Sequence, residues 1–122
     1  MCETCRVCID ACPTGAIYEE YKVDANLCIS YQTIENKKDL PSYIDLSGWI
    51  FGCDVCQDVC PFNKRKFFTE EEGFYPIKKI FGKSSEELYK IKEEEFQITF
   101  AGSPVKRTKF AGWKRNLERV TK

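Results

Sequence analysis

Several features that often point to a function are missing from this sequence of 122 residues. Histidine is absent, so a metal site in this chain has no imidazole ligand and must rely on other side chains. Nineteen basic and nineteen acidic side chains cancel, so net charge by itself indicates no partner. No stretch approaches the roughly 18–20 consecutive apolar residues of a membrane span, and no apolar signal region follows Met1. We therefore expect a soluble, cytoplasmic protein that does not bind a membrane.

Cysteine, by contrast, is abundant, with eight residues in two closely spaced runs and one isolated position. The first run is Cys2, Cys5, Cys8 and Cys12, and the second is Cys53, Cys56 and Cys60. Cysteines this close tend to converge on a shared centre, whereas disulfides stabilise most when they join distant segments. Four disulfides of a secreted domain are therefore the disfavoured alternative, and ligation of a metal or cluster in a reducing cytoplasm is the prediction.

The first run has the spacing of the bacterial [4Fe–4S] ferredoxin motif, including a proline after its fourth cysteine. Gaps of two residues let one tight loop reach three corners of a cubane cluster. Cys12 lies one helical turn beyond Cys8, so its side chain is directed toward the other cluster. Pro13 has no N–H group and ends the turn.

The second run is incomplete, because a full motif ending at Cys60 would have a cysteine at position 50, where Ile50 stands. Cys28 is the one cysteine left over, and we assign it to the vacant corner. The first predicted cluster then uses Cys2, Cys5, Cys8 and Cys60, and the second uses Cys12, Cys28, Cys53 and Cys56. This exchange of partners between the runs should hold the clusters close, which suits stepwise electron transfer.

Two zinc sites of four cysteines each, in a module that binds RNA, are the alternative from another class. Zinc knuckles favour two well-separated CxxC pairs, and a run with gaps of two, two and three residues before proline is not their pattern. Iron, sulfide and zinc analysis separates the two hypotheses.

The chain divides into three predicted parts and belongs to the α+β class. Residues 1–62 form a bacterial-type two-[4Fe–4S] ferredoxin-like domain, residues 63–83 an irregular connector, and residues 84–122 a helical C-terminal extension with a basic end. Within the first part we expect a helical turn at 8–12, a hairpin of 16–18 with 22–24, helices at 26–35 and 51–60, and a further helical turn after Pro41.

The C-terminal extension has three predicted helical pieces. Ser84 and Glu87 form a capping box that opens the first. The second carries Phe96 and Phe100. The last covers 108–121 and has one apolar face, which consists of Phe110, Trp113, Leu117 and Val120.

Longer segments add a family resemblance to these motifs. Residues 28–35 read CISYQTIE and residues 50–63 read IFGCDVCQDVCPFN. Together with GSPVKRT at 102–108 and WKRN at 113–116, they stand in the order found in the tRNA epoxyqueuosine reductases. The chain resembles that family over nearly its whole length. It departs at Phe62, where tryptophan is common, and at Trp49, where a basic residue is common.

The resemblance implies a function in queuosine synthesis, where the family removes the epoxide oxygen of epoxyqueuosine in tRNA with a cobalamin reduced through two [4Fe–4S] clusters. It implies that the first cluster lies nearer the corrin and that Ser30, Cys53, Asp54 and Val55 border the cofactor. The family's N-terminal domain, which holds most of the corrinoid pocket and the catalytic acid, has no counterpart in these residues. We therefore expect this chain to be the iron–sulfur half, excised or naturally truncated, and to shuttle electrons without reducing the nucleoside unless that upstream domain is supplied.

Basic side chains are concentrated at the C-terminal end. Residues 106–122 carry seven basic residues and one acidic residue, a net charge of +6, which leaves −6 for the rest of the chain. The plain explanation is a solvated helix face, but segregated charge favours phosphate contact, and the resemblance makes tRNA the partner. The predicted tRNA contacts are Lys37, Lys106, Arg107, Lys114 and Arg115.

A free-standing ferredoxin that serves several partners is the remaining alternative. Its chain would end soon after the second motif, whereas 61 residues follow Pro61 in this sequence. In either case a separate electron donor, which the sequence does not identify, must reduce the clusters.

Overall fold

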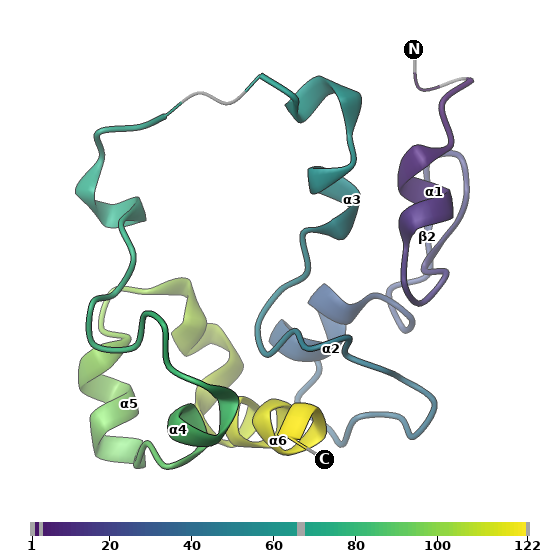
Figure 1. The fold of residues 1–122 in the computed structure, drawn as a ribbon. Coiled ribbons are helices and arrows are strands. Elements are labelled where there is room, and N and C mark those ends of the chain that lie inside the picture. The colour runs from purple at the N-terminus through teal and green to yellow at the C-terminus, as the bar shows by residue number, and fades with distance from the viewer. Residues whose placement is uncertain (1, 3, 66–67, 122) are drawn as a thin grey trace.

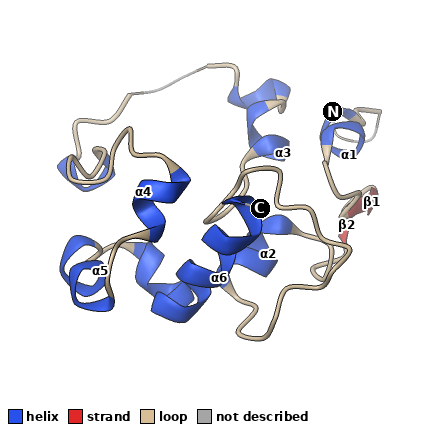
Figure 2. Cartoon of the chain, turned by 60° about the horizontal axis from the view of Figure 1, so that its bottom comes forward, coloured by secondary structure: helices blue, strands red, loops and turns tan. Residues whose placement is uncertain are grey.

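A computed structural model of the protein describes residues 2, 4–65 and 68–121. Its elements follow one another around a ring-like path, with the two cysteine-bearing helices α1 and α3 side by side and the C-terminal helix α6 below α2 and beside α4 (Figure 1). Helices predominate, and the one sheet of the described residues has two strands (Figure 2). Within these residues, no helix is both long and apolar enough to cross a membrane.

The first half contains three short helices and a hairpin. The helices are α1 (Val7–Ala11), α2 (Ile29–Ile34) and α3 (Val55–Asp58), followed by the 3-10 turn η1 (Pro61–Asn63). Strands β1 (Ile17–Glu19) and β2 (Lys22–Val23) pair antiparallel, with Ile17 opposite Val23. The hairpin prediction is therefore confirmed, although the strand ends differ by one residue.

Two predicted helices are shorter than expected. The helix predicted from residue 26 begins at Ile29, because the Asp24 carboxylate accepts a hydrogen bond from the Asn26 amide and holds residues 24–27 in a turn. The helix predicted from residue 51 begins at Val55, because Gly52 adopts a left-handed φ of 73° that a helix does not accommodate. Both shortenings leave a cysteine, Cys28 or Cys53, just before the helix.

The C-terminal extension is helical, as the sequence indicated: it comprises α4 (Ser85–Tyr89), α5 (Glu93–Thr99), η3 (Pro104–Thr108) and α6 (Lys109–Thr121). The segment predicted as an irregular connector contains one 3-10 turn among its described residues, η2 (Glu72–Phe74). The capping box of α4 is confirmed: Ser84 Oγ accepts from the Glu87 amide at 3.2 Å, and the Ser84 amide donates to the Glu87 carboxylate at 2.9 Å. Such a cap stabilises a short helix by about 1 kcal/mol.

The buried apolar side chains form two clusters, and α6 reaches both. The C-terminal cluster consists of Leu88, Ile91, Phe96, Phe100, Trp113 and Leu117. The second cluster consists of Ile29, Leu40, Ile44 and Leu46, with Val120 of α6 packed against it. Helices α1 and α3 contribute no buried residue. The cysteine-bearing helices therefore lie outside both apolar cores.

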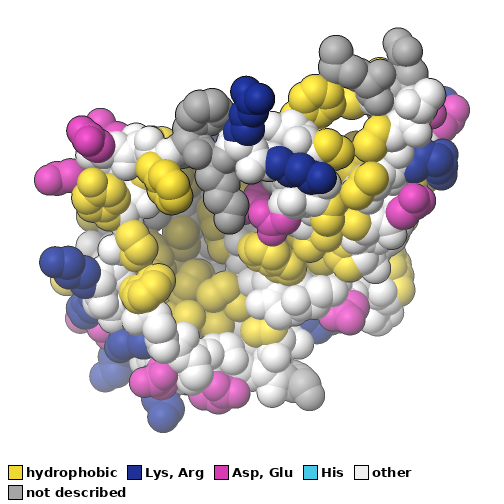
Figure 3. Space-filling model, turned by 45° about the horizontal axis from the view of Figure 1, so that its top comes forward, with side chains coloured by type: hydrophobic (Ala, Val, Ile, Leu, Met, Phe, Trp, Pro, Cys, Tyr) yellow, Lys and Arg dark blue, Asp and Glu magenta, His cyan; other side chains and the backbone are white. Residues whose placement is uncertain are grey.

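Large aromatic side chains remain exposed along the connector between the two halves. Phe68, Phe74 and Phe81 are 94%, 78% and 73% exposed. Figure 3 shows one face of the molecule, on which many hydrophobic side chains lie at the surface. Ile77 and Ile80 are the connector residues that pack against the C-terminal cluster.

Candidate metal centre

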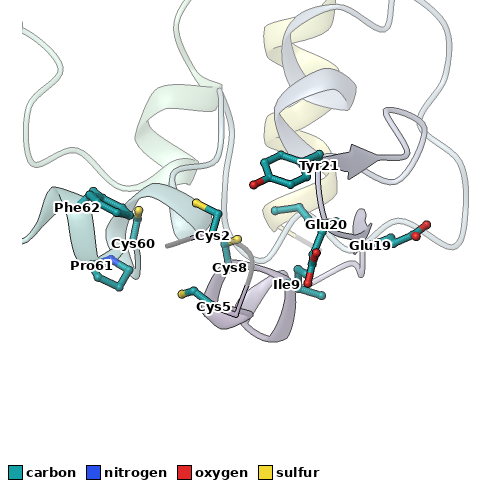
Figure 4. A pocket seen from close by; sticks show the side chains of 11 residues that line it. Cys2, Cys5, Cys8, Ile9, Glu19, Glu20, Tyr21, Cys60, Pro61 and Phe62 are labelled. Carbon is teal, nitrogen blue, oxygen red and sulfur yellow. The ribbon is translucent and has the colours of Figure 1, made fainter.

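The first cysteine set, Cys2, Cys5, Cys8 and Cys60, lines a pocket of about 140 Å³. Three of these side chains come from the N-terminal segment and α1, and they face Cys60, which lies between α3 and η1 (Figure 4). Ile9, Ile17 and Phe62 supply apolar walls, and Tyr21 also borders the pocket. The structure thus brings together four thiols from two segments some fifty residues apart in sequence.

The second cysteine set, Cys12, Cys28, Cys53 and Cys56, lines a separate pocket of about 150 Å³. Cys12 follows the last residue of α1, Cys28 precedes the first residue of α2, Cys53 precedes α3, and Cys56 lies within α3. Ala16, Ile17, Val23, Ile29 and Val55 form the apolar part of the lining. The eight cysteines therefore divide four and four, in the same sets as the sequence assignment.

The surroundings shift the pKa values of two cysteines in the second set in opposite directions. Burial raises the pKa of Cys53; the Val55 amide lowers it, and the charges of Cys56, Cys28 and Cys12 raise it again, with a net increase. Burial also raises the pKa of Cys12, but hydrogen bonds from the amides of Ile17, Thr14 and Ala16 and from the Thr14 hydroxyl lower it more, with a net decrease. Thiolates so close repel one another unless a cationic centre neutralises them.

These features suit a [4Fe–4S] cubane in each pocket. Four thiols with apolar walls meet the cluster's requirement for four thiolate ligands, and amides directed at a sulfur are the hydrogen bonds that tune such clusters. All eight cysteines are free. In the part of the chain that the structure describes, no three His, Cys, Asp or Glu side chains are grouped closely enough to hold a single metal ion.

The residues expected to border the corrin are dispersed. Cys53 and Val55 line the second pocket rather than the first. Asp54 is exposed and lies with Gln57, Asp58 and Asn63 in a different depression. Ser30 is half-buried on α2 and belongs to neither cysteine pocket. The corrin contacts, and the proximity of the first cluster to the corrin, stay predictions.

Most of the basic residues expected to contact tRNA make contacts within the chain. Arg115 donates to the carbonyls of Gln32, Asn36 and Lys38. Arg107 pairs with Glu35 at 2.5 Å, and Lys114 donates to the Tyr89 carbonyl and lies 3.7 Å from that ring's centroid. Lys37 donates at 2.6 Å to the carbonyls of Ile34 and Arg107, and Lys106 is exposed.

Several of these cations nevertheless share one depression, which we call the basic pocket. It is lined by Lys37, Lys38, Lys109, Lys114 and Arg115, with Asp39 and Glu118 as its acidic members. The pKa of Lys37 is lowered, mainly by burial. The negative charge of Glu35 raises this pKa, but the positive charges of Lys109, Arg107 and Arg115 lower it again. An anion bound in this pocket would relieve that repulsion.

The sequence interpretation named Lys38 only as a weaker candidate beside Lys37, and it missed Lys109 and Asn116. Lys38 and Lys109 enter the basic pocket through the packing of η3 and α6 against α2. Asn116 is fully buried, although amides are seldom fully buried. Its position was a usable signal, because an amide between Trp113 and Leu117 lies beside the apolar face of the predicted helix.

Comparison with known proteins agrees with this geometry. Residues 1–63, about half of the chain, match the family model described as a 4Fe-4S double cluster binding domain. The chain belongs to this family of two-cluster iron–sulfur proteins.

More specific similarity extends over nearly the whole chain. It is 46% identical over 123 residues to the epoxyqueuosine reductase of Atelocyanobacterium thalassa, which covers 96% of this chain and 40% of that protein. It is 41% identical over 118 residues to the epoxyqueuosine reductase of Escherichia coli, which covers 95% of this chain and 31% of that protein. The chain thus spans less than half the length of these curated relatives, of which it matches the iron–sulfur portion.

Solved structures give the same result. A selenomethionine-labelled epoxyqueuosine reductase superimposes with a TM-score of 0.84 at 32% identity and covers 98% of this chain and 32% of the solved one. Another epoxyqueuosine reductase, solved with an epoxyqueuosine-modified tRNA-Tyr stem loop, gives a TM-score of 0.74 at 31% identity over the same shares. The alternatives of a free-standing ferredoxin and of a zinc-binding RNA module are not favoured by these matches.

Proposed function

We propose that this chain carries electrons through two [4Fe–4S] clusters to a cobalamin, as the iron–sulfur portion of a cytoplasmic tRNA epoxyqueuosine reductase. The observation that carries the proposal is the division of eight cysteines into two pockets of four, with Cys12 and Cys60 exchanged between the runs. That exchange is the ligand pattern of bacterial two-cluster ferredoxins. We also propose that the chain divides into a two-cluster domain (1–62), a connector (63–83) and a helical extension (84–122).

The chain's own groups have separate parts in this function. When bound, each [4Fe–4S] cluster supplies one-electron redox chemistry. The thiolates of the first and second cysteine sets hold the clusters, and the amides directed at Cys12 stabilise negative charge on its sulfur. The apolar side chains that line both pockets give the clusters surroundings of low polarity. Removal of an epoxide oxygen as water consumes two electrons and two protons, so delivery through two one-electron centres matches its stoichiometry.

The remaining parts of the reaction lie with partners. Cobalamin and the catalytic acid are contributed by the corrinoid-binding domain that the resemblance implies, and Ser30, Cys53, Asp54 and Val55 are the proposed border with it. An electron donor of unspecified kind reduces the clusters.

Metal analysis tests the two-cluster proposal directly. We expect the anaerobically reconstituted chain to contain about eight iron and about eight acid-labile sulfide per molecule, the sum for two four-iron clusters. Inductively coupled plasma analysis and a sulfide assay measure both. A content of four iron, or of two zinc without sulfide, would contradict the proposal.

We further propose that the basic pocket binds the tRNA backbone. Lys37, Lys114 and Arg115 form part of its wall, and Lys106 and Arg107 lie on the adjoining η3 turn. Among the described residues, the side chains of Lys38, Lys106 and Lys109 make no hydrogen bond or ion pair, so they can contact phosphate without leaving a partner.

Salt dependence measures these phosphate contacts. Replacing Lys38, Lys106 and Lys109 with Gln should weaken tRNA binding and flatten the slope of log K against log salt by about two units, at roughly 0.7–0.9 per contact. Sequence preference should change little, because phosphate contacts position RNA without reading bases. The matched control replaces three exposed lysines elsewhere, Lys78, Lys83 and Lys92, with Gln. An equal effect of both triple variants would show that net charge, not this pocket, matters.

A further inference from the structure

A buried hydrogen-bond network joins the C-terminal helix to the segments that carry Cys28 and Cys53. Its centre is Asn116 of α6, whose side-chain amide donates to the carbonyls of Thr33 at 2.9 Å and Ile50 at 3.0 Å. The Asn116 carbonyl oxygen accepts from Arg115 Nε and Nη2 at 3.1 and 2.9 Å. This residue is 0% exposed, and each of its hydrogen-bonding atoms has a partner.

Thr33 of α2 continues the network toward the cysteines. It too is 0% exposed. Its hydroxyl donates to the Ile29 carbonyl at 2.8 Å and accepts from the Gly52 amide at 3.0 Å. The Thr108 hydroxyl donates to the Thr33 carbonyl at 2.8 Å. One threonine therefore ties the start of α2 to the residue that immediately precedes Cys53.

The two hydrogen bonds to residues 50 and 52 fix the position of the backbone segment that leads into the second pocket. Asn116 holds the Ile50 carbonyl and Thr33 holds the Gly52 amide, one on each side of Phe51. The left-handed φ of 73° at Gly52 then turns the chain toward Cys53. Because a buried hydrogen bond has one geometry and an apolar contact tolerates sliding, this network sets the relative register of the two segments.

We propose that α6 acts through Asn116 and Thr33 as a positioning element for the second cysteine set, fixing Cys28 relative to Cys53 so that both ligate one cluster. The proposal rests on the two-cluster function above. Asn116 and Thr33 line neither cysteine pocket; they act through the backbone beside Cys28 and Cys53.

The effect is specific to the second cluster because the first cysteine set has no such link. In the part of the chain that the structure describes, hydrogen bonds join η3 and α6 to residues between 32 and 50, and none joins them to residues 2, 4–24 or 53–63. Of the first set, only Cys60 lies on the segment after Gly52, and it stands eight residues further on, beyond α3. A lesion at Asn116 should therefore leave Cys2, Cys5, Cys8 and Cys60 able to hold their cluster.

The test uses the full chain, reconstituted anaerobically, in three variants. Asn116→Leu keeps the number and branching of the side-chain non-hydrogen atoms and removes the hydrogen bonds. Thr33→Val removes only the hydroxyl and serves if the first variant fails to fold. Arg119→Met is the matched control, because Arg119 also ties α6 to backbone carbonyls, those of Leu40, Pro41, Ser42 and Ile44, in a segment without cysteine.

We expect iron per chain to fall from about eight to about four in Asn116→Leu and Thr33→Val, since each cluster holds four, and to stay near eight in Arg119→Met. In reduced-state electron paramagnetic resonance spectra, the signal lost should be the one that Cys56→Ala also removes. The signal that Cys5→Ala removes should remain. Denaturant midpoints of the cluster-free proteins should fall alike in Asn116→Leu and Arg119→Met, which separates positioning from a general loss of stability.

Equal loss of both clusters, retention of eight iron in both Asn116→Leu and Thr33→Val, or loss of the second cluster in Arg119→Met would each overturn the positioning role. An unsubstituted chain that holds no clusters would instead overturn the two-cluster function itself.

Discussion

Cys60→Ala should remove the cluster held by Cys2, Cys5 and Cys8, although Cys60 belongs to the other cysteine run in the sequence. The reason is geometric: Cys60 follows α3 and lines the first pocket, whereas Cys56, one turn earlier, lines the second. Loss of one thiolate of four should reduce iron from about eight to about four per chain. The converse should hold for Cys12→Ala, which should damage the cluster of Cys28, Cys53 and Cys56.

Spectra of single variants read out this exchange. Cys5→Ala and Cys56→Ala provide the two reference spectra, one for each cluster, in redox-titrated electron paramagnetic resonance. Cys60→Ala should match Cys5→Ala, and Cys28→Ala should match Cys56→Ala. Since water can replace a lost thiolate, the affinity for the fourth iron is the more sensitive measurement. Indistinguishable spectra for Cys60→Ala and Cys56→Ala would rule out the exchange.

Removal of the clusters should unfold the cysteine-bearing part of the chain and leave the C-terminal helices folded. Helices α1 and α3 contain no buried residue, and Ala16 is the one buried apolar residue among residues 4–24. Such a segment cannot offset the backbone entropy of ordering, about 1–2 kcal/mol per residue, by apolar burial. Cluster binding must supply the missing stability, as structural metals do in other small domains.

The C-terminal part has its own core and should survive. Phe96, Phe100 and Trp113 pack with ring centroids 5.0–5.8 Å apart, and all three are nearly inaccessible to solvent. Hydrogen–deuterium exchange before and after anaerobic chelation measures both regions. Amides of residues 4–24 and 53–63 should approach the exchange rates of an unstructured chain, while those of α5 and α6 keep their protection. Unchanged exchange at residues 4–24, or simultaneous loss in α6, would show that the clusters do not divide the stability in this way.

Short-range features were predictable from the sequence because their causes are local. The capping box at Ser84 and Glu87 depends on four consecutive residues, and the hairpin at 16–24 depends on its alternation and turn. Helix starts were less predictable. Asp24 and Gly52 each form a turn just before a helix, so that the helix begins a few residues later than predicted. The spacing of apolar residues does not reveal such a turn.

The contacts of the basic residues, by contrast, could not be predicted from the sequence. Their clustering at the C-terminal end was evident, but charge in a sequence does not say whether a cation faces solvent or a carbonyl group. Arg115 donates to three backbone carbonyls near the end of α2, where burial also lowers its pKa. Lys38, seventy-one residues before Lys109, shares a pocket with it because η3 and α6 pack against α2.

The sequence by itself determined which residues are available as cluster ligands, since the spacing of cysteines within a run follows from how a short loop can surround a cubane. The same spacing cannot place one run against the other. The ferredoxin pattern assigned Cys60 to the first set and left Cys28 for the second, but only the tertiary structure shows what brings them there: the packing of α1 beside α3, and the hydrogen bond from the Gly52 amide to Thr33 of α2. It also decided that Asn116 is a buried hydrogen-bonding centre, since the carbonyls that it binds belong to residues 83 and 66 positions away in the chain.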